Sequence, residues 1–201
     1  DNVEIDEPEP RIFFVSQHHA NEVLTLEVMI DMMDILSQGY GIDPEITAWI
    51  DDYQIYIVPC HNPDGTQYVF NVSSGWRKNR HDNGDGTFGV DLNRNYSYQW
   101  GGSGSSGDPC SATYRGPSAF SEPETQAFER YFASVMKDQN GPNGDDEIAP
   151  SAPITTTAKI RTPSISTLAT NAANRVFRNP FISSTPLELV ETNCFVRQTG
   201  A

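Results

Sequence analysis

Apolar segments of two kinds alternate over residues 11–59, and this pattern leaves few possible architectures. Residues 11–16 form a short apolar run, which is typical of a buried strand. At residues 22–38 the apolar side chains cover most of a helical circumference, and residues 53–59 form a β-branched and aromatic run. A strand, a long helix and a second strand predict a parallel crossover unit and therefore an α/β fold.

Two more helices are indicated by signals at their N-termini. Pro44 stands at a first-turn position, which predicts a short helix beginning at residues 43–45. Ser121 and Glu124 have the capping-box spacing, and apolar residues recur at helical intervals from residue 127 to residue 135. The Asn-Pro-Asp-Gly sequence at residues 62–65 is typical of a tight turn, and we expect it at the same sheet edge as the end of the first strand.

Charge divides the chain into two regions. Residues 1–147 hold 25 of the 27 acidic residues, whereas residues 148–187 hold none. We therefore predict a domain at residues 1–137, followed at residues 138–201 by a linker and an atypical Ser/Thr/Ala-rich tail. One hypothesis is that the tail is not the native continuation of the domain, for example because of a shifted reading frame. A solvated tail is the alternative.

Composition excludes two classes of partner. A formal net charge of −14 repels a phosphate backbone, so nucleic acid is not expected as a partner. No apolar run approaches the roughly 18 residues that a membrane span needs. The chain also carries two glycosylation sequons, Asn71-Val72-Ser73 and Asn95-Tyr96-Ser97, a pattern that is common by chance.

A pair of potential metal ligands lies between the first predicted strand and the long helix. His19 and Glu22 are three residues apart, so both side chains can turn toward one point at the start of the helix. An imidazole nitrogen and a carboxylate oxygen are ligands that Zn²⁺ accepts readily. Two ligands do not complete a site, and the alternative interpretation is that Glu22 only interacts with the helix dipole.

Guanidinium groups are concentrated in two short segments of this acidic chain. Residues 76–80 contain Arg77 and Arg80, and residues 89–95 contain Asn93 and Arg94. Arginine binds a carboxylate through a two-pronged, charge-assisted pair, and an adjacent asparagine amide adds a donor. The clustering predicts an anion-binding site, with a chance basic surface as the alternative.

These segments, taken in order, carry a family resemblance. The chain resembles the zinc carboxypeptidases of the carboxypeptidase A family over roughly residues 11–135. The motifs concerned are His19-Ala20-Asn21-Glu22, Asn62-Pro63-Asp64-Gly65, Trp76-Arg77-Lys78-Asn79-Arg80, Gly89-Val90-Asp91-Leu92-Asn93-Arg94-Asn95 and the segment at residues 113–125, which begins Thr113-Tyr114-Arg115-Gly116-Pro117.

The resemblance implies a fold, a cofactor and an activity. The expected fold is a mixed parallel and antiparallel sheet flanked by helices, of which this chain holds an incomplete part. The expected activity is hydrolysis of the C-terminal peptide bond of a peptide or protein by a zinc-dependent enzyme. His19 and Glu22 resemble two zinc ligands, Arg77 resembles the arginine that stabilises the oxyanion, and Asn93 and Arg94 resemble the pair that binds the terminal carboxylate. An extracellular or periplasmic location is implied in the same way.

The chain departs from the family pattern in its second half. The family's third zinc ligand is a downstream histidine, but the histidines here are His18, His19, His61 and His81. The general base of the family is equally unrecognised after residue 137. Two alternatives therefore stand beside the peptidase: a catalytically inactive fragment that binds carboxylates or peptides, and a related zinc amidohydrolase acting on N-acyl amino acids.

Overall fold

The computed structural model describes residues 11–135, which divide into two compact units. Among the described residues, the first unit comprises residues 11–16, 24–59 and 133–135. The second unit comprises residues 17–23 and 60–132. Each unit is described by itself below. The predicted linker and tail at residues 138–201 lie outside the described residues.

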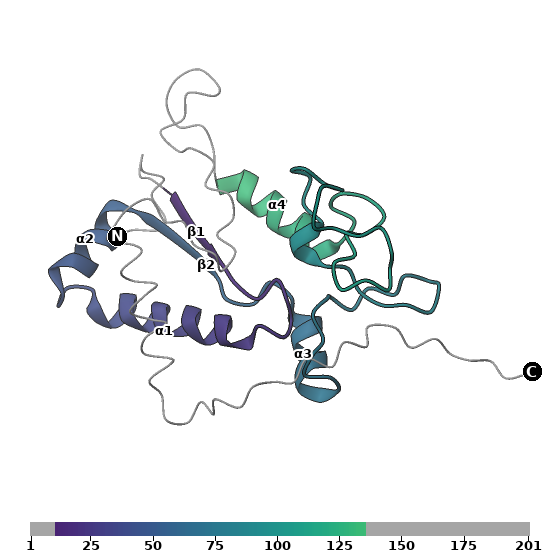
Figure 1. The fold of residues 1–201 in the computed structure, drawn as a ribbon. Helices are drawn as coiled ribbons and strands as arrows, with labels where there is room; N and C mark the ends of the chain where they lie inside the picture. The colour runs from purple at the N-terminus through teal and green to yellow at the C-terminus, as the bar shows by residue number, and fades with distance from the viewer. Residues whose placement is uncertain (1–10, 136–201) are drawn as a thin grey trace, which may run out of the picture. The chain divides into compact units, whose positions relative to one another are not determined.

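The first unit is built on a parallel pair of strands. Strand β1 (Arg11–Val15) pairs with β2 (Gln54–Val58), with Phe13 opposite Tyr56. The connection between them contains helix α1 (Val23–Gly39) and helix α2 (Pro44–Asp52). Figure 1 shows the two strands running side by side. The predicted strand–helix–strand order is confirmed.

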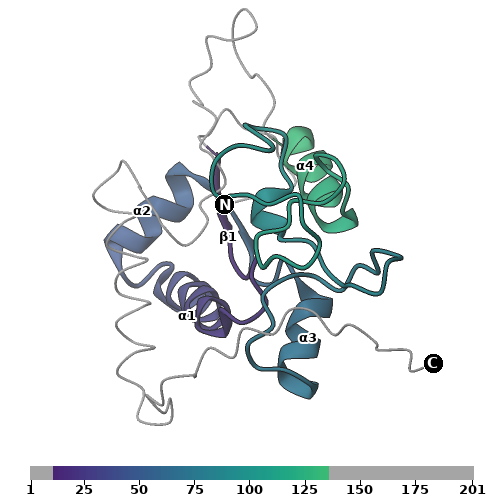
Figure 2. The ribbon, with the colours of Figure 1, turned by 45° about the vertical axis from the view of Figure 1, so that its right-hand side comes forward.

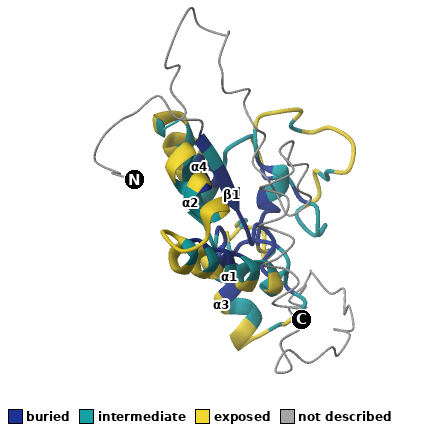
Figure 3. Ribbon diagram, turned by 90° about the vertical axis from the view of Figure 1, so that its left-hand side faces the viewer, coloured by how far each residue is buried: buried dark blue, intermediate teal, exposed yellow. Residues whose placement is uncertain are grey.

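The core of the first unit lies between the strands and the two helices. Its buried members come from β1, α1 and α2, and the isoleucines of β2 pack against them. They are Phe14, Met29, Met32, Leu36 and Trp49. Figure 3 shows β1 buried while the outer side of α1 is exposed. The long helix is therefore one-sided, although its sequence is apolar over most of its circumference.

Local signals set the boundary between the two helices of the first unit. Gly41 has φ +71°, a conformation that a residue without a side chain adopts at little cost, and it follows the end of α1. The Asp43 carboxylate then accepts hydrogen bonds from the backbone N–H of Glu45 at 2.8 Å and of Ile46 at 3.3 Å. Together with Pro44 in the first turn, this N-cap confirms the predicted start of α2.

The second unit consists mostly of loops. Its elements are α3 (Pro63–Asn71), a 3₁₀ turn η1 (Leu92–Arg94) and most of α4 (Pro123–Val135). Figure 2 shows the long connection between α3 and α4. The tight turn expected at residues 62–65 is wrong, because these residues begin α3. The Asn62 side chain accepts the backbone N–H of Gly65 at 3.0 Å, and Pro63 takes the first turn.

Helix α4 is confirmed, but its predicted capping box does not form. Ser121 Oγ donates instead to the Glu122 carboxylate at 2.7 Å, and the Glu124 carboxylate accepts from Asn79. The N–H of Glu122 is bound by the side-chain oxygen of Asn95 at 3.2 Å. A residue distant in the sequence thus binds the N–H group just before the first turn of α4.

The sheet of the described residues is smaller than the resemblance implies. Residues 11–135 contain the parallel pair β1–β2, and antiparallel pairing occurs there only as an isolated bridge between Asp82 and Phe88. The mixed sheet therefore stays a prediction. No helix within this part of the chain has the length and apolar character that would take it through a lipid bilayer.

Core packing of α1 predicts different costs for two adjacent methionines. Met32 is 1% exposed within the core cluster, whereas Met33 is 46% exposed. We expect Met32→Ala to lower the free energy of unfolding by about 3 kcal/mol, because it removes buried contacts and leaves a cavity. The matched Met33→Ala change should stay within about 0.5 kcal/mol. Urea denaturation followed by circular dichroism measures both, and equal effects would contradict the assigned core.

Candidate active site

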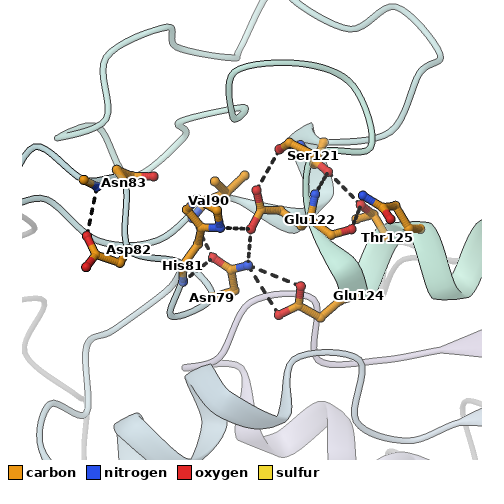
Figure 4. Close-up of polar contacts among 12 residues, drawn as sticks. Asn79, His81, Asp82, Asn83, Val90, Ser121, Glu122, Glu124 and Thr125 are labelled. Atoms are coloured by element: carbon orange, nitrogen blue, oxygen red, sulfur yellow. Dashed lines mark hydrogen bonds and ion pairs between the residues drawn. The ribbon is translucent and has the colours of Figure 1, made fainter.

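Asn79 joins the two arginine-containing segments of the second unit. Its N–H donates to Val90 O at 3.0 Å, and its side-chain oxygen accepts the N–H of Val90 at 2.7 Å. Its amide nitrogen donates to Glu122 Oε2 at 2.7 Å (Figure 4). Asn79 and Glu122 are both buried. One side chain therefore fixes Arg77, two residues upstream, against the segment that carries Asp91.

The close approach of these segments depends on a glycine. Gly89 has φ +84°, and a Cβ at this position would lie 2.5 Å from Asn79 O and 2.7 Å from the Lys78 side chain. Any other residue would be strained in this conformation and would push the two backbones apart. Gly89 therefore allows the pairing of residues 79 and 90.

Asn95 fixes the other end of the same segment. Its amide nitrogen donates to Arg115 O, Ser118 O and Ser121 Oγ at 2.9, 3.1 and 2.8 Å. Its oxygen accepts from the N–H of Glu122 and, at 2.7 Å, from Thr125 Oγ1. Asn95 is fully buried, so these bonds satisfy a side chain that water does not reach.

The two predicted metal ligands face each other. His19 Nδ1 lies 2.9 Å from Glu22 Oε1. The turn that carries them is held by two backbone bonds, from Ala20 N to Arg77 O at 2.9 Å and from Glu22 N to His19 O at 3.1 Å. Glu22 comes directly before α1, as expected from the sequence. The structure thus brings the imidazole and the carboxylate to one point.

A buried carboxylate lies on the other side of the His19 ring. Asp91 Oδ1 is 3.1 Å from His19 Nε2, and Asp91 is 0% exposed. Arg77 donates to Asp91 Oδ2 from Nε at 3.3 Å and from Nη2 at 3.2 Å. Arg77 Nη1 also lies 3.9 Å from Glu22 Oε1. Three of the predicted site residues, His19, Glu22 and Arg77, are therefore gathered around one aspartate.

Charge balance within this cluster shifts three pKa values. Burial raises the pKa of Asp91, but the hydrogen bond from His19 and the charges of His19 and Arg77 outweigh it, so the net shift is downward. Burial also raises the pKa of Glu22, but the hydrogen bond with His19 and the charges of His19 and Arg77 lower it overall. Burial lowers the pKa of His19, but the hydrogen bonds with Asp91 and Glu22 raise it overall. Both carboxylates are thus held ionised against an imidazole that can donate to both.

The predicted carboxylate-binding pair lies in η1, next to Asp91. The N–H of Asn93 donates to Asp91 Oδ1 at 3.0 Å, which caps the 3₁₀ turn. The Arg94 side chain donates to Gly104 O at 2.9 Å and to Asn93 O at 3.0 Å. The backbone of Asn93 therefore joins the cluster around Asp91, whereas the Arg94 guanidinium is bound by backbone carbonyl groups of its own loops.

A second histidine pair is buried beside the His19 turn. Tyr96 Oη lies 2.8 Å from His18 Nε2 and 3.2 Å from His61 Nε2, and the two imidazole rings are 4.4 Å apart. The amide of Asn62 donates to His18 O at 3.1 Å. Burial lowers the pKa of His61 to about 4 and the pKa of His18 well below its usual value, so both rings are uncharged at neutral pH. The His61 ring also packs edge-on against Phe128. His18 and His61 act as polar core residues here.

Sequence comparison now places the chain. A family model described as zinc carboxypeptidase matches residues 3–144. The chain belongs to the zinc carboxypeptidase family. It is 42% identical over 118 residues to a metallocarboxypeptidase A-like protein of Trichophyton verrucosum, a match over 59% of this chain and 27% of that protein. It is 44% identical over 111 residues to metallocarboxypeptidase A of Arthroderma otae, over 55% of this chain and 26% of that protein.

Two solved structures also match this chain. Carboxypeptidase A from Helicoverpa armigera matches with a TM-score of 0.58 and 34% identity, over 63% of this chain and 31% of that one. Thrombin activatable fibrinolysis inhibitor matches with a TM-score of 0.63 and 28% identity, over 66% of this chain and 34% of that one. The chain thus spans about a quarter of the length of the curated relatives and about a third of the solved chains.

The donor set of the cluster fits part of a zinc site. His19 Nδ1 and Glu22 Oε1 supply the imidazole nitrogen and carboxylate oxygen that zinc binds, and Asp91 holds the remaining ring nitrogen of His19. A carboxylate in that outer position fixes the tautomer and orientation of a ligating histidine. Among residues 11–135 no third His, Cys, Asp or Glu joins the pair, so a complete site needs a further ligand.

Asp91 is a residue of this cluster that the sequence patterns did not single out. It stands between Val90 and Leu92, which are both fully buried. A carboxylate between two buried apolar neighbours must have a charged or hydrogen-bonding partner, and this is the signal that could have identified it. Asn79 and Asn95 gave no such signal, because their partners are scattered along the sequence.

Acid sensitivity is expected from the buried His61. An unfolded chain takes up a proton on His61 near its ordinary pKa of 6.5, whereas the folded chain does so only near 4. His61 should therefore have no effect on stability above pH 6.5 and should alone lower it by about 3 kcal/mol as the pH drops from 6.5 to 4. His61→Gln should make this part of the profile less steep in denaturant titrations at several pH values, and the slope that remains includes the neighbouring His18, whose pKa burial also lowers. An unchanged slope in His61→Gln would show that the ring is protonated in the folded state.

Proposed function

We propose that this chain is part of a zinc-dependent metallocarboxypeptidase, which hydrolyses the C-terminal peptide bond of peptides or proteins. The observation that carries the proposal is the His19–Glu22 pair, with Asp91 behind the imidazole and Arg77 beside it, in a member of the zinc carboxypeptidase family. In this assignment residues 1–137 are a partial catalytic domain. The change of charge after residue 147 supports treating residues 138–201 as a separate segment.

His19 and Glu22 are the residues that would hold the metal. Nδ1 of His19 faces Glu22, and its Nε2 lies 3.1 Å from the buried Asp91 carboxylate and 2.6 Å from Arg77 Nη2. A bound zinc ion would polarise the scissile carbonyl group and acidify a water molecule. The third ligand and the general base would come from outside residues 11–135.

Arg77 is suited to stabilise negative charge next to this pair. Two of its N–H groups are held by Asp91, so the guanidinium is fixed in position while its side chain stays 26% exposed. Arg77 Nη1 lies 3.9 Å from Oε1 of Glu22, one of the two proposed zinc ligands. A preorganised cation of this kind stabilises an oxyanion as charge develops on the carbonyl oxygen.

Asn93 and Arg94 are suited to bind the free carboxylate of the substrate. Arg94 carries five N–H donors, and its hydrogen bonds to Gly104 and Asn93 leave part of the fork available. An arginine–carboxylate pair would select the chain end over an internal peptide bond. The proposed substrate is therefore a peptide or protein C-terminus, and the proposed location, extracellular or periplasmic, follows from the family resemblance.

Zinc binding provides the first test. Isothermal titration calorimetry of the 201-residue chain should show one zinc per chain. His19→Ala and Glu22→Gln should each weaken binding at least about tenfold, because each removes a ligand. Glu27→Gln, at an exposed position of α1, is the matched control for Glu22→Gln and should bind like the wild type. Equal affinity in all three variants would place the metal elsewhere and overturn the assignment.

Hydrolysis provides the second test. With zinc present, release of the terminal residue from an N-blocked dipeptide should be lost in His19→Ala. It should fall about 10²–10³-fold in kcat in Arg77→Met, measured at saturating zinc. Arg94→Met should mainly raise KM. Cleavage of an N-acyl amino acid in place of the dipeptide would support the amidohydrolase instead. Binding of the peptide with neither zinc uptake nor cleavage would support an inactive binding fragment.

A further inference from the structure

The two glycosylation sequons of this chain occupy opposite environments. Both have the Asn-x-Ser pattern, one at residues 71–73 and the other at residues 95–97. The sequence alone treats them as equivalent. The structure separates them, because one acceptor nitrogen is exposed and the other is enclosed by hydrogen bonds.

Asn71 is at the exposed end of a helix. It is the last residue of α3, and its chain neighbours Phe70 and Val72 are 70% and 66% exposed. The backbone leaves the helix immediately, with the N–H of Val72 and of Ser73 both bonded to Tyr68 O. Within residues 11–135, no hydrogen bond of the Asn71 side chain competes for its amide nitrogen. The acceptor atom is therefore accessible without any change in the fold.

Asn95, in contrast, is buried. It is 0% exposed, and its amide nitrogen donates to Arg115 O, Ser118 O and Ser121 Oγ. A sugar on this nitrogen would break bonds that hold the segment after residue 110 to the candidate active site. A chain modified at Asn95 could not adopt the described fold.

We propose that Asn71 is an acceptor site for an N-linked glycan and that Asn95 is not. The co-substrate is an oligosaccharide joined through pyrophosphate to a lipid, as supplied in a eukaryotic secretory pathway. The bond between the anomeric carbon and the pyrophosphate oxygen breaks, a bond from Asn71 Nδ2 to that carbon forms, and Nδ2 gives up one proton. The lipid pyrophosphate is the leaving group.

The test is to express the full 201-residue chain in yeast behind a secretory leader peptide. The secreted and cell-retained fractions are both treated with peptide N-glycosidase in ¹⁸O water, which converts an occupied asparagine to labelled aspartate. Peptide mass spectrometry should find the label at residue 71 in both fractions. In the secreted, folded fraction it should find none at residue 95.

Matched variants make the assignment specific. Asn71→Gln and Ser73→Ala should each abolish the mobility shift on deglycosylation, and the conservative Ser73→Thr should keep it. Ser97→Ala, which removes the other sequon, should leave the secreted chain with the same shift as the wild type. Unlabelled Asn71 in the translocated chain, or labelled Asn95 in the secreted chain, would overturn the proposal.

Discussion

The Asp91 carboxylate is the interaction on which the candidate active site depends. It is fully buried, binds the Arg77 guanidinium through one oxygen and faces the His19 ring nitrogen with the other. Removing either cationic partner would leave a buried charge short of compensation, which is among the most costly changes in a protein interior. The positions of the proposed metal-binding imidazole and of the proposed oxyanion-stabilising arginine are therefore coupled through a residue that takes no direct part in the proposed reaction.

Buried asparagines hold the segments of the second unit together, whereas regular secondary structure does so in the first unit. Asn62, Asn79 and Asn95 are each enclosed, and each joins segments distant in the sequence through side-chain bonds to backbone groups. A loop held this way can present backbone and side chains in orientations that a helix or strand does not allow. This explains how the second unit keeps His19, Arg77 and Asp91 within hydrogen-bond distance while containing few helical residues.

Sequence patterns predicted the elements whose signals are local. The strand at β1, helix α1, the Asp43–Pro44 start of α2 and helix α4 follow from periodicity or capping residues close in the chain. The predictions failed where residues distant in the sequence determine the local structure. Asn62 could cap a helix or begin a turn, and the helix formed. Ser121 and Glu124 had the spacing of a cap, but Glu122 and Asn79 bind them instead. The grouping of His19, Glu22 and Arg77 was expected, whereas the aspartate joining them depends on the fold.

Nuclear magnetic resonance of the histidine side chains tests the central claim most directly. Long-range ¹H–¹⁵N spectra of the zinc-loaded chain distinguish the two ring nitrogens of each histidine. With Glu22 facing Nδ1 and Asp91 facing Nε2, we expect zinc at Nδ1 of His19 and a proton on Nε2 that is hydrogen-bonded to Asp91. Zinc coordinated through Nε2, or His19 signals that do not move when zinc is added, would contradict the account.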